Sequence, residues 1–176
     1  ASLVRDAQRR GVEVLPPDVN RSAARCSLDP QVTSCNEEGW AVRVGLGYIR
    51  GVGEDEAEAV VAGQPYDGVA DLARRAPVAK DSLEAIVACG ACDEFGPRRQ
   101  LLWRLGATPR GETVAGGHRQ LALPLEPTEE TPELPAQTPW ETMLADYKHT
   151  SLSVGVHPLQ LLRPHLAASV CTSADM

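Results

Sequence analysis

The stretch GYIRGVGEDEAEAVVAG, residues 47–63, places a glycine-flanked valine between two short runs of helical character. In the second run, Ala57 and Val60 or Val61 fall on one side of a helix and form a stripe suited to burial. Glycine has no side chain, so a turn at Gly51–Gly53 allows the backbone to approach another molecule closely. The stretch therefore predicts two short helices joined by a tight turn.

This arrangement resembles a helix-hairpin-helix motif, in which the hairpin offers backbone N–H groups at a helix N-terminus to a DNA phosphate. The candidate DNA contacts at this hairpin are Arg50, Gly51 and Gly53. The acidic residues Glu54, Asp55 and Glu56 favour the start of the helix through its dipole, but they repel a phosphate at the same place. We therefore favour a structural role for this hairpin over phosphate contact, and we expect the carboxylates of the EDEAE run to face solvent.

A second pair of helices is predicted directly downstream. Its parts are DGVADLARRA (67–76), the turn PVAK (77–80) and DSLEAIVACGACDEFG (81–96). The cations around this pair have the right charge for DNA phosphates, and they are Arg74, Arg75, Lys80, Arg98 and Arg99. The alternative interpretation is that they are the solvated ends of exposed helices. Two such pairs in tandem predict one four-helix unit that straddles a duplex backbone without reading bases.

Upstream of residue 48 the pattern changes to short β-like segments. SLVRDAQRR (2–10) indicates the end of an amphipathic helix, which Gly11 stops. Strand-like pieces follow at VEVL (12–15), around RCSLDP (25–30) and around WAVRVGL (40–46). Together they predict a small β element.

The segment PPDVNRS, residues 16–22, lies between the first two of these pieces. Asp18, Asn20 and Ser22 can each fold a side chain back onto nearby backbone N–H groups. We therefore expect a rigid turn here.

The C-terminal part opens with a strong helix start. Thr138 can cap the helix, Pro139 suits its first position, and Glu141 completes a capping box. We expect this helix to run to about His149. His157 is expected to be a turn residue rather than a ligand or a base.

Composition limits the function classes. The 176 residues carry a formal net charge of −7, so any nucleic-acid role must rest on local pattern rather than on a basic excess. The N-terminus lacks the order of a signal peptide, and no apolar run approaches the roughly 18 residues that span a membrane. We expect a cytoplasmic protein without membrane contact.

Five cysteines at irregular spacing fit a reducing compartment better than a disulfide framework. Cys89 and Cys92 form a CxxC, and together with Cys26 and Cys35 they could make a four-thiolate zinc site. Small buried thiols at the end of a helix are the interpretation that we favour for the CxxC.

Three segments, in order and spacing, resemble the C-terminal half of the bacterial C-family DNA polymerases, the DNA polymerase III alpha subunits. They are GVEVLPPDVNRS (11–22), AVRVGLGYIRGVGEDEAEAVV (41–61) and LEAIVACGACDEFGPRRQLLW (83–103). The final segment, MLADYKHTSLSVGVHPLQLLRPHL (143–166), is similar to the error-prone, translesion branch of that family.

The resemblance implies that residues 14–22 belong to the end of a fingers region and that the following helices hold the duplex behind the active site. In this family, palm-domain aspartates hold magnesium for nucleotidyl transfer, and the palm would lie before residue 1. We therefore expect no catalytic residue, metal ligand or cofactor in this chain, with Mg2+ only in the palm. The expected partners are duplex DNA and other translesion-synthesis proteins. The second hairpin departs from the family pattern at Pro77 and Asp81, where a glycine and a basic residue are common.

Residues 106–137 are rich in Gly, Pro, Thr and Glu, a composition typical of a solvated linker. Within the linker, QLALPL (120–125) is similar to the peptides by which bacterial polymerases bind the sliding clamp. The candidate clamp-binding residues are Gln120, Leu121, Leu123 and Leu125. A mobile tether of this kind presents apolar anchors to a preformed groove. The alternative is that these leucines pack back on the helices.

The sequence thus predicts an α+β fold, mostly α-helical, in which a tandem helix-hairpin-helix unit follows a small β element and precedes a disordered linker and a C-terminal helix. The predicted divisions are a fingers-like end (1–47), the tandem unit (48–105), the linker (106–137) and a helix with a connector toward an oligonucleotide-binding-fold domain (138–176). The predicted function is to hold duplex DNA for an error-prone polymerase in DNA replication and repair. The alternative is a non-catalytic adaptor that contacts proteins without binding DNA.

Overall fold

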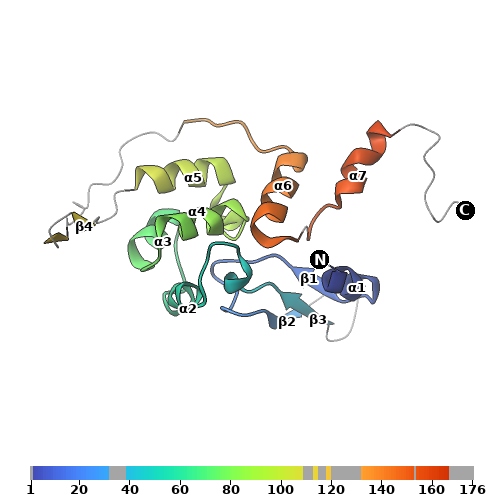
Figure 1. Cartoon of the computed structure of the whole chain (residues 1–176), viewed down its shortest axis with the longest axis horizontal. Coiled ribbons are helices and arrows are strands. Elements are labelled where there is room, and N and C mark those ends of the chain that lie inside the picture. The colour runs from blue at the N-terminus through green and yellow to red at the C-terminus, as the bar shows by residue number, and fades with distance from the viewer. Residues whose placement is uncertain are drawn as a thin grey trace, which may run out of the picture.

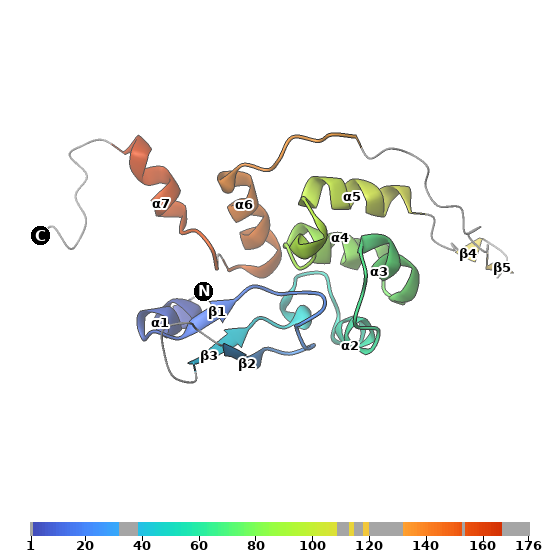
Figure 2. The ribbon, with the colours of Figure 1, turned by 180° about the vertical axis from the view of Figure 1, so that it is seen from behind.

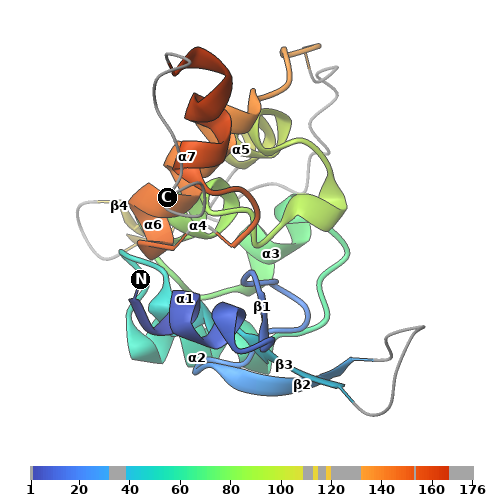
Figure 3. The same cartoon turned by 90° about the vertical axis from the view of Figure 1, so that its right-hand side faces the viewer.

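The computed structural model describes residues 2–31, 39–108, 113–114, 118–119, 132–152 and 154–166. Helices α5 (Arg98–Ala107), α6 (Pro139–Thr150) and α7 (Pro158–Leu162) lie along one side of the molecule (Figure 1). The small sheet, α1 (Ser2–Arg9) and α2 (Glu54–Ala62) lie along the opposite side, as the side view in Figure 3 also shows. The α+β class predicted from the sequence is confirmed.

Three short strands form the predicted β element. Strand β3 (Gly39–Arg43) lies in the middle, parallel to β1 (Glu13–Leu15) and antiparallel to β2 (Ser27–Gln31). Before β1, helix α1 ends at Arg9, and Gly11 follows with a φ of 81°, a left-handed conformation that suits glycine and stops the helix as expected. Val14, Val44 and Leu152 form a small buried cluster here, with Ala7 and Val154 packed against it.

The two predicted helix pairs are present, with two differences. The first helix of the first pair is a single 3-10 turn, η1 (Leu46–Tyr48), followed by α2. The second pair consists of α3 (Val69–Arg75) and α4 (Lys80–Ala88), so its second helix ends eight residues before the end of the predicted segment, residue 96. A further 3-10 turn, η2 (Asp93–Phe95), leads to α5, which packs on both α3 and α4 (Figure 2).

One hydrophobic core holds the helical unit together. Every element from η1 to α5 except η2 contributes fully buried side chains, and the turns between them contribute others. The largest side chains of this core are Leu46, Ile49, Val60, Tyr66, Leu72, Leu83, Ile86, Val87, Cys92, Leu101 and Leu105. Val19, between β1 and β2, belongs to the same core, and its N–H donates to Ala91 O at 2.8 Å. The segment around Val19 therefore shares the interior of the helical unit.

The turn at residues 16–22 is built in part as predicted. The Asp18 carboxylate accepts from the N–H groups of Asn20 and Arg21, and Ser22 Oγ accepts from the Asp18 N–H at 2.9 Å. The prediction was wrong for Asn20, because its side-chain amide pairs with the N–H and C=O of Tyr66, at 2.8 and 2.9 Å. An amide carries both a donor and an acceptor, so it can bind a distant backbone segment as a strand would.

The C-terminal helix starts as predicted. Thr138 Oγ1 accepts from the Glu141 N–H at 3.3 Å, and the Glu141 carboxylate accepts from the Thr138 N–H at 2.9 Å. The helix ends one residue after His149, where Ser151 adopts a left-handed φ of 54°. His157 caps the next helix, α7, because its Nδ1 accepts from the Leu159 N–H, and the 3-10 turn η3 (Arg163–His165) follows.

The predicted linker begins inside α5, which ends at Ala107. The structure describes a short antiparallel pair within its range, β4 (Thr113–Val114) and β5 (His118–Arg119), and residues 132–138 before α6. The clamp-like residues Gln120, Leu121, Leu123 and Leu125 lie outside the described residues. Within the described ranges, none of the helices combines the length and the apolarity that crossing a membrane would require.

Candidate nucleic-acid interface

The first hairpin, residues 51–53, contains one glycine that its backbone requires. Gly51 has a φ of 91°, a left-handed conformation that side chains disfavour. Gly53 caps α2 with an ordinary φ of −71° and ψ of 160°, so glycine is not required there. Val52 between them is buried in the core. The hairpin is thus held by an inserted valine and a positive-φ glycine.

The second hairpin, residues 77–79, repeats the buried valine and the cap, but Pro77 stands where the first has the positive-φ Gly51. Ala79 caps α4 with a φ of −62° and a ψ of 156°, close to the values of Gly53. Val78 enters the core as Val52 does. Three pairs of buried positions therefore match in spacing across the two hairpins: Val52 and Val78, Ala57 and Leu83, and Val60 and Ile86.

Glu56 connects the two hairpins. Its Oε2 accepts from the Gly53 N–H at 3.1 Å, and its Oε1 accepts from the Ala79 N–H at 2.9 Å. Ser82 Oγ, the matching position of the second hairpin, lies 2.8 Å from Glu56 Oε2 and 2.9 Å from Gly51 O. The N–H groups of Ala79 and Gly53, together with the Ser82 hydroxyl, lower the pKa of Glu56. Glu54, Asp55 and Glu58 are exposed as predicted, but Glu56 is partly buried, because the fold brings the start of α4 beside the start of α2.

Three of the candidate cations are the most accessible to a phosphate, namely Arg50, Arg74 and Lys80. Arg50 is exposed, its backbone N–H donates to His149 O, and no carboxylate among the described residues pairs with its guanidinium. Arg74 lies 3.9 Å from Asp71, and Lys80 Nζ lies 3.8 Å from Glu84, both at the long limit of an ion pair. Exposed pairs of this kind contribute about 0–1 kcal/mol, so a phosphate can compete for these cations.

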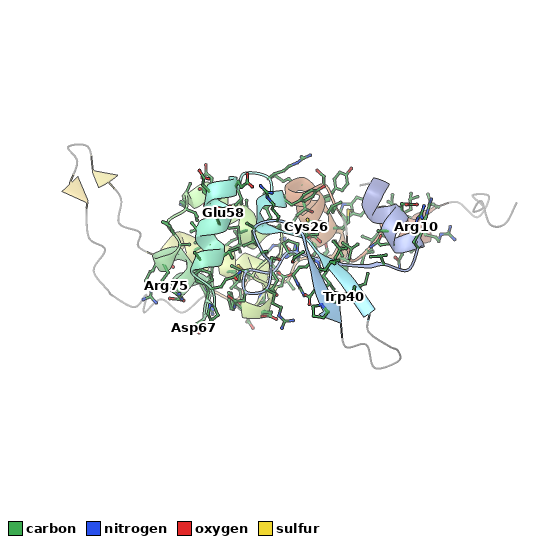
Figure 4. All side chains as sticks on the ribbon, turned by 90° about the horizontal axis from the view of Figure 1, so that it is seen from below. Arg10, Cys26, Trp40, Glu58, Asp67 and Arg75 are labelled. Carbon is green, nitrogen blue, oxygen red and sulfur yellow. The ribbon has the colours of Figure 1, made fainter. Side chains whose placement is uncertain are left out.

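Arg75 is exposed, but its guanidinium is engaged by other groups of the chain. Its guanidinium donates to Asp71 Oδ2 at 2.8 Å and to Pro65 O at 2.9 Å, and it lies 5.0 Å from the centre of the Tyr66 ring. These contacts hold the end of α3 against the segment that follows α2, at the end of the molecule where Figure 4 labels Arg75 and Asp67.

Arg98 and Arg99 connect α5 to α6. The side chain of Arg98 is only 10% exposed and lies between Asp93 and Asp146. Burial alone would lower its pKa, but hydrogen bonds to Asp93 and Asp146 outweigh burial and raise it. Arg99 donates to Glu141 at 2.7 Å and to Pro135 O at 2.9 Å. Both guanidinium groups are thus occupied by the chain itself.

The cysteines of the CxxC are buried. Cys89 Sγ donates to Ile86 O, and burial raises the pKa of its thiol to about 12. Cys92 is buried as well, whereas Cys26 is exposed and Cys35 lies outside the described residues. In the part of the chain that the structure describes, no three His, Cys, Asp or Glu side chains gather as metal ligands would. The structure therefore favours the interpretation of Cys89 and Cys92 as buried thiols.

Sequence reasoning missed Glu56 and Ser82 as a pair. One signal was present: Glu56 lies three residues after Gly53, the spacing of a capping box, which predicts that its carboxylate turns back toward the helix start. Nothing comparable pointed to Ala79, because it lies 23 positions further along the chain.

Comparison with known proteins agrees with this geometry. A family model described as "Helix-hairpin-helix motif" matches residues 11–102, which is more than half of the chain and extends to both sides of the predicted division at residue 47. That division stays a prediction.

The curated relatives include an error-prone DNA polymerase of Bordetella parapertussis, 38% identical over 172 residues. Error-prone DNA polymerases of Burkholderia pseudomallei and Corynebacterium diphtheriae are 38% identical over 181 residues and 37% identical over 166 residues. These alignments cover 96%, 99% and 94% of this chain, but only 16%, 16% and 14% of the relatives. The chain thus spans a small part of the length of the curated relatives it matches. It belongs to the helix-hairpin-helix family, and the relatives that carry the same segment are named error-prone DNA polymerases.

Proposed function

We propose that this chain holds duplex DNA, without reading its sequence, as a non-catalytic portion of an error-prone DNA polymerase. The observation that carries the proposal is that hydrogen bonds of Glu56 and Ser82 join the two hairpins. Because the starts of α2 and α4 meet, Arg50 and Lys80 each directly adjoin a residue, Gly51 or Ala79, that takes part in these hydrogen bonds. Such an arrangement suits two phosphates of one backbone better than an isolated hairpin would.

The cations that we assign to DNA contact are Arg50, Lys80 and Arg74. They are exposed, and none is held by a short ion pair in the described part of the chain. Contact between such side chains and phosphate is independent of sequence and weakens with salt. The sequence pattern also identified Arg75, Arg98 and Arg99 as candidates. Their guanidinium groups bind other groups of the chain, so we propose that they stabilise the fold rather than contact DNA.

The wider setting is proposed on the family resemblance and on the names of the relatives. The parent would be a DNA polymerase III alpha subunit of the translesion branch, located in the cytoplasm, with Mg2+ bound in its palm. The clamp contact through residues 120–125 is proposed on the sequence pattern alone.

The experiment is fluorescence anisotropy of a labelled duplex titrated with the chain at low and moderate salt. We expect binding that weakens with ionic strength, and about tenfold or greater loss in Arg50→Glu and in Lys80→Glu. Arg10→Glu is the matched control, because Arg10 lies at the opposite end of the molecule from α2 and α3 (Figure 4). It makes the same charge change and should have little effect.

Two results would contradict the proposal. One is an absence of duplex binding even at low salt. The other is an equal loss in all three variants, which would indicate that only the net charge of the chain matters. A duplex of unrelated sequence should bind equally well, since phosphate contacts carry no sequence information.

A second candidate function is the adaptor that contacts proteins without binding DNA. It is supported by the net charge of −7 and by an exposed apolar stripe on α6, formed by Trp140, Leu144 and Tyr147. A packed apolar interface need not weaken with salt, which separates it from phosphate binding. If the chain does not bind duplex DNA even at low salt, the adaptor function becomes the better-supported one. Titration with purified sliding clamp is then the next measurement.

A further inference from the structure

Glu56 occupies a position that bears on how the hairpins could contact DNA. Each of its two carboxylate oxygens accepts from the capping N–H of a different helix, Oε2 from Gly53 and Oε1 from Ala79. The Ser82 hydroxyl has a single proton and two acceptors in range, Glu56 Oε2 and Gly51 O. The charged carboxylate is the stronger acceptor of the two.

These two N–H groups are the ones that a phosphate would approach if it were bound by the backbone at the helix starts. Because both N–H groups already donate to Glu56, neither is free to donate to a phosphate. The negatively charged carboxylate also occupies the place where the phosphate would bind. Glu54 and Asp55 add further negative charge in the first turn of α2. To bind these N–H groups, a phosphate would have to displace Glu56. That displacement breaks three charge-assisted hydrogen bonds to the carboxylate, two from backbone N–H groups and one from the Ser82 hydroxyl.

Two exposed cations flank the hairpins in the chain. Arg50 directly precedes the first hairpin, and Lys80 directly follows the second. Both are exposed, whereas Glu56 is partly buried between the helix starts.

We propose that Glu56 is a positioning residue for DNA binding. It joins the two hairpins and takes up their capping N–H groups, so that the duplex is contacted by the flanking side chains of Arg50 and Lys80 and not by the hairpin backbone. The DNA part of this inference rests on the proposed function. The connection between the hairpins does not.

The decisive variant is Glu56→Gln, compared with Glu58→Gln. Glutamine keeps the shape of Glu56 but has only one carbonyl oxygen, so it can serve one hairpin and leaves the other N–H facing an amide NH2. Glu58 is exposed on the same helix, and its replacement removes the same charge. Removing a negative charge near DNA should by itself leave binding unchanged or slightly tighter.

We expect Glu56→Gln to weaken duplex binding by about threefold to tenfold in the anisotropy titration, despite the loss of a negative charge. Glu58→Gln should bind at least as tightly as the unaltered chain. Ser82→Ala, which changes no charge, should weaken binding in the same direction by a smaller factor. If Glu56→Gln instead binds DNA as tightly as Glu58→Gln or more tightly, the hairpin N–H groups reach the phosphate, and the proposal is overturned.

A measurement without DNA tests the connection itself. Amide hydrogen exchange in the free chain should show Gly53 and Ala79 protected together and both less protected in Glu56→Gln, with no change in Glu58→Gln. Unchanged protection in Glu56→Gln would overturn the inference whether or not the chain binds DNA. Loss of protection in a chain that fails to bind duplex would uphold the connection, and it would locate the failure in the proposed function.

Discussion

The two hairpins share a buried valine and a cap conformation, but they differ in backbone at their first residue. The first uses Gly51 with a positive φ and begins its helix with three acids, whereas the second has Pro77 at the matching position and begins its helix with Lys80. What they share is a buried valine and nearly identical capping dihedrals at Gly53 and Ala79. The comparison teaches that a buried valine and the cap at the helix start are common to both hairpins, whereas the first residue and the charges differ.

The largest expected effect lies in the helix after the second hairpin, where the core side chain is larger. Leu83 in α4 and its counterpart Ala57 in α2 are both fully buried, but leucine fills more of the core than alanine. We expect Leu83→Ala to lower the free energy of unfolding by about 3 kcal/mol, through lost burial and a cavity. Urea denaturation measures this. Leu144→Ala on exposed α6 is the control and should cost less than about 0.5 kcal/mol. Similar costs would show that Leu83 is not a core residue.

The valines test whether the hairpins are equivalent. Val52 and Val78 are 7% and 6% exposed, so Val52→Ala and Val78→Ala remove the same buried groups. Each should lower the free energy of unfolding by about 2 kcal/mol, and the two values should agree within about 0.5 kcal/mol. If urea denaturation gives losses of unfolding free energy that differ by more than about 1 kcal/mol, the two valines are not equivalent core residues.

The glycines should behave unequally. Gly51→Ala puts a side chain at a φ of 91° and should cost about 1–2 kcal/mol. Gly53→Ala should cost less than about 0.5 kcal/mol, because Ala79 already holds the same backbone conformation. An added Cβ at Gly53 would meet Glu56 Oε2 at an ordinary 3.7 Å. Equal costs in thermal or urea unfolding would contradict this assignment of roles.

The smallest expected effect is the pH dependence that Glu56 contributes. Its pKa in the folded chain is lowered from the ordinary 4.5, so it stabilises the fold fully above that value. The contribution is lost as the pH falls through the lowered pKa, because the protonated carboxyl no longer accepts as strongly.

Unfolding midpoints between about pH 7 and pH 3 measure this contribution. Glu56→Gln should flatten the acid side of the profile, and Glu58→Gln should not. Part of the dependence should remain in both variants, since the pKa values of Asp71 and Glu141 are lowered too. A profile of Glu56→Gln that parallels the unaltered chain would show that Glu56 is not engaged.

Much of the helical unit could be predicted from the sequence. The starts of α2 and α6, the stripe containing Ala57 and Val60, and the short strands before residue 48 all follow from residues a few positions apart. The helix cap at Thr138 is the clearest case, because both of its partners lie within three residues. Such features depend on local geometry, which a sequence pattern reports directly.

The candidate site was predicted less completely. The sequence pattern identified candidate DNA-contacting cations by their charge and position. It could not tell that Arg50 is accessible to DNA whereas Arg98 is not. One is exposed and unpaired among the described residues, and the other is enclosed by Asp93 and Asp146. Whether a guanidinium is available to a phosphate depends on the carboxylates that folding brings to it.

The sequence by itself determined the starts of α2, α4 and α6, the positions of the two hairpins and the buried stripe of α2, because these depend on spacing along the chain. Only the tertiary structure decided which polar groups meet. Glu56 and Ala79 are 23 positions apart, Asn20 and Tyr66 are 46 apart, and Arg98 and Asp146 are 48 apart. Each of these pairs satisfies a polar group that packing takes from water, and the partner is selected by the fold rather than by any local pattern.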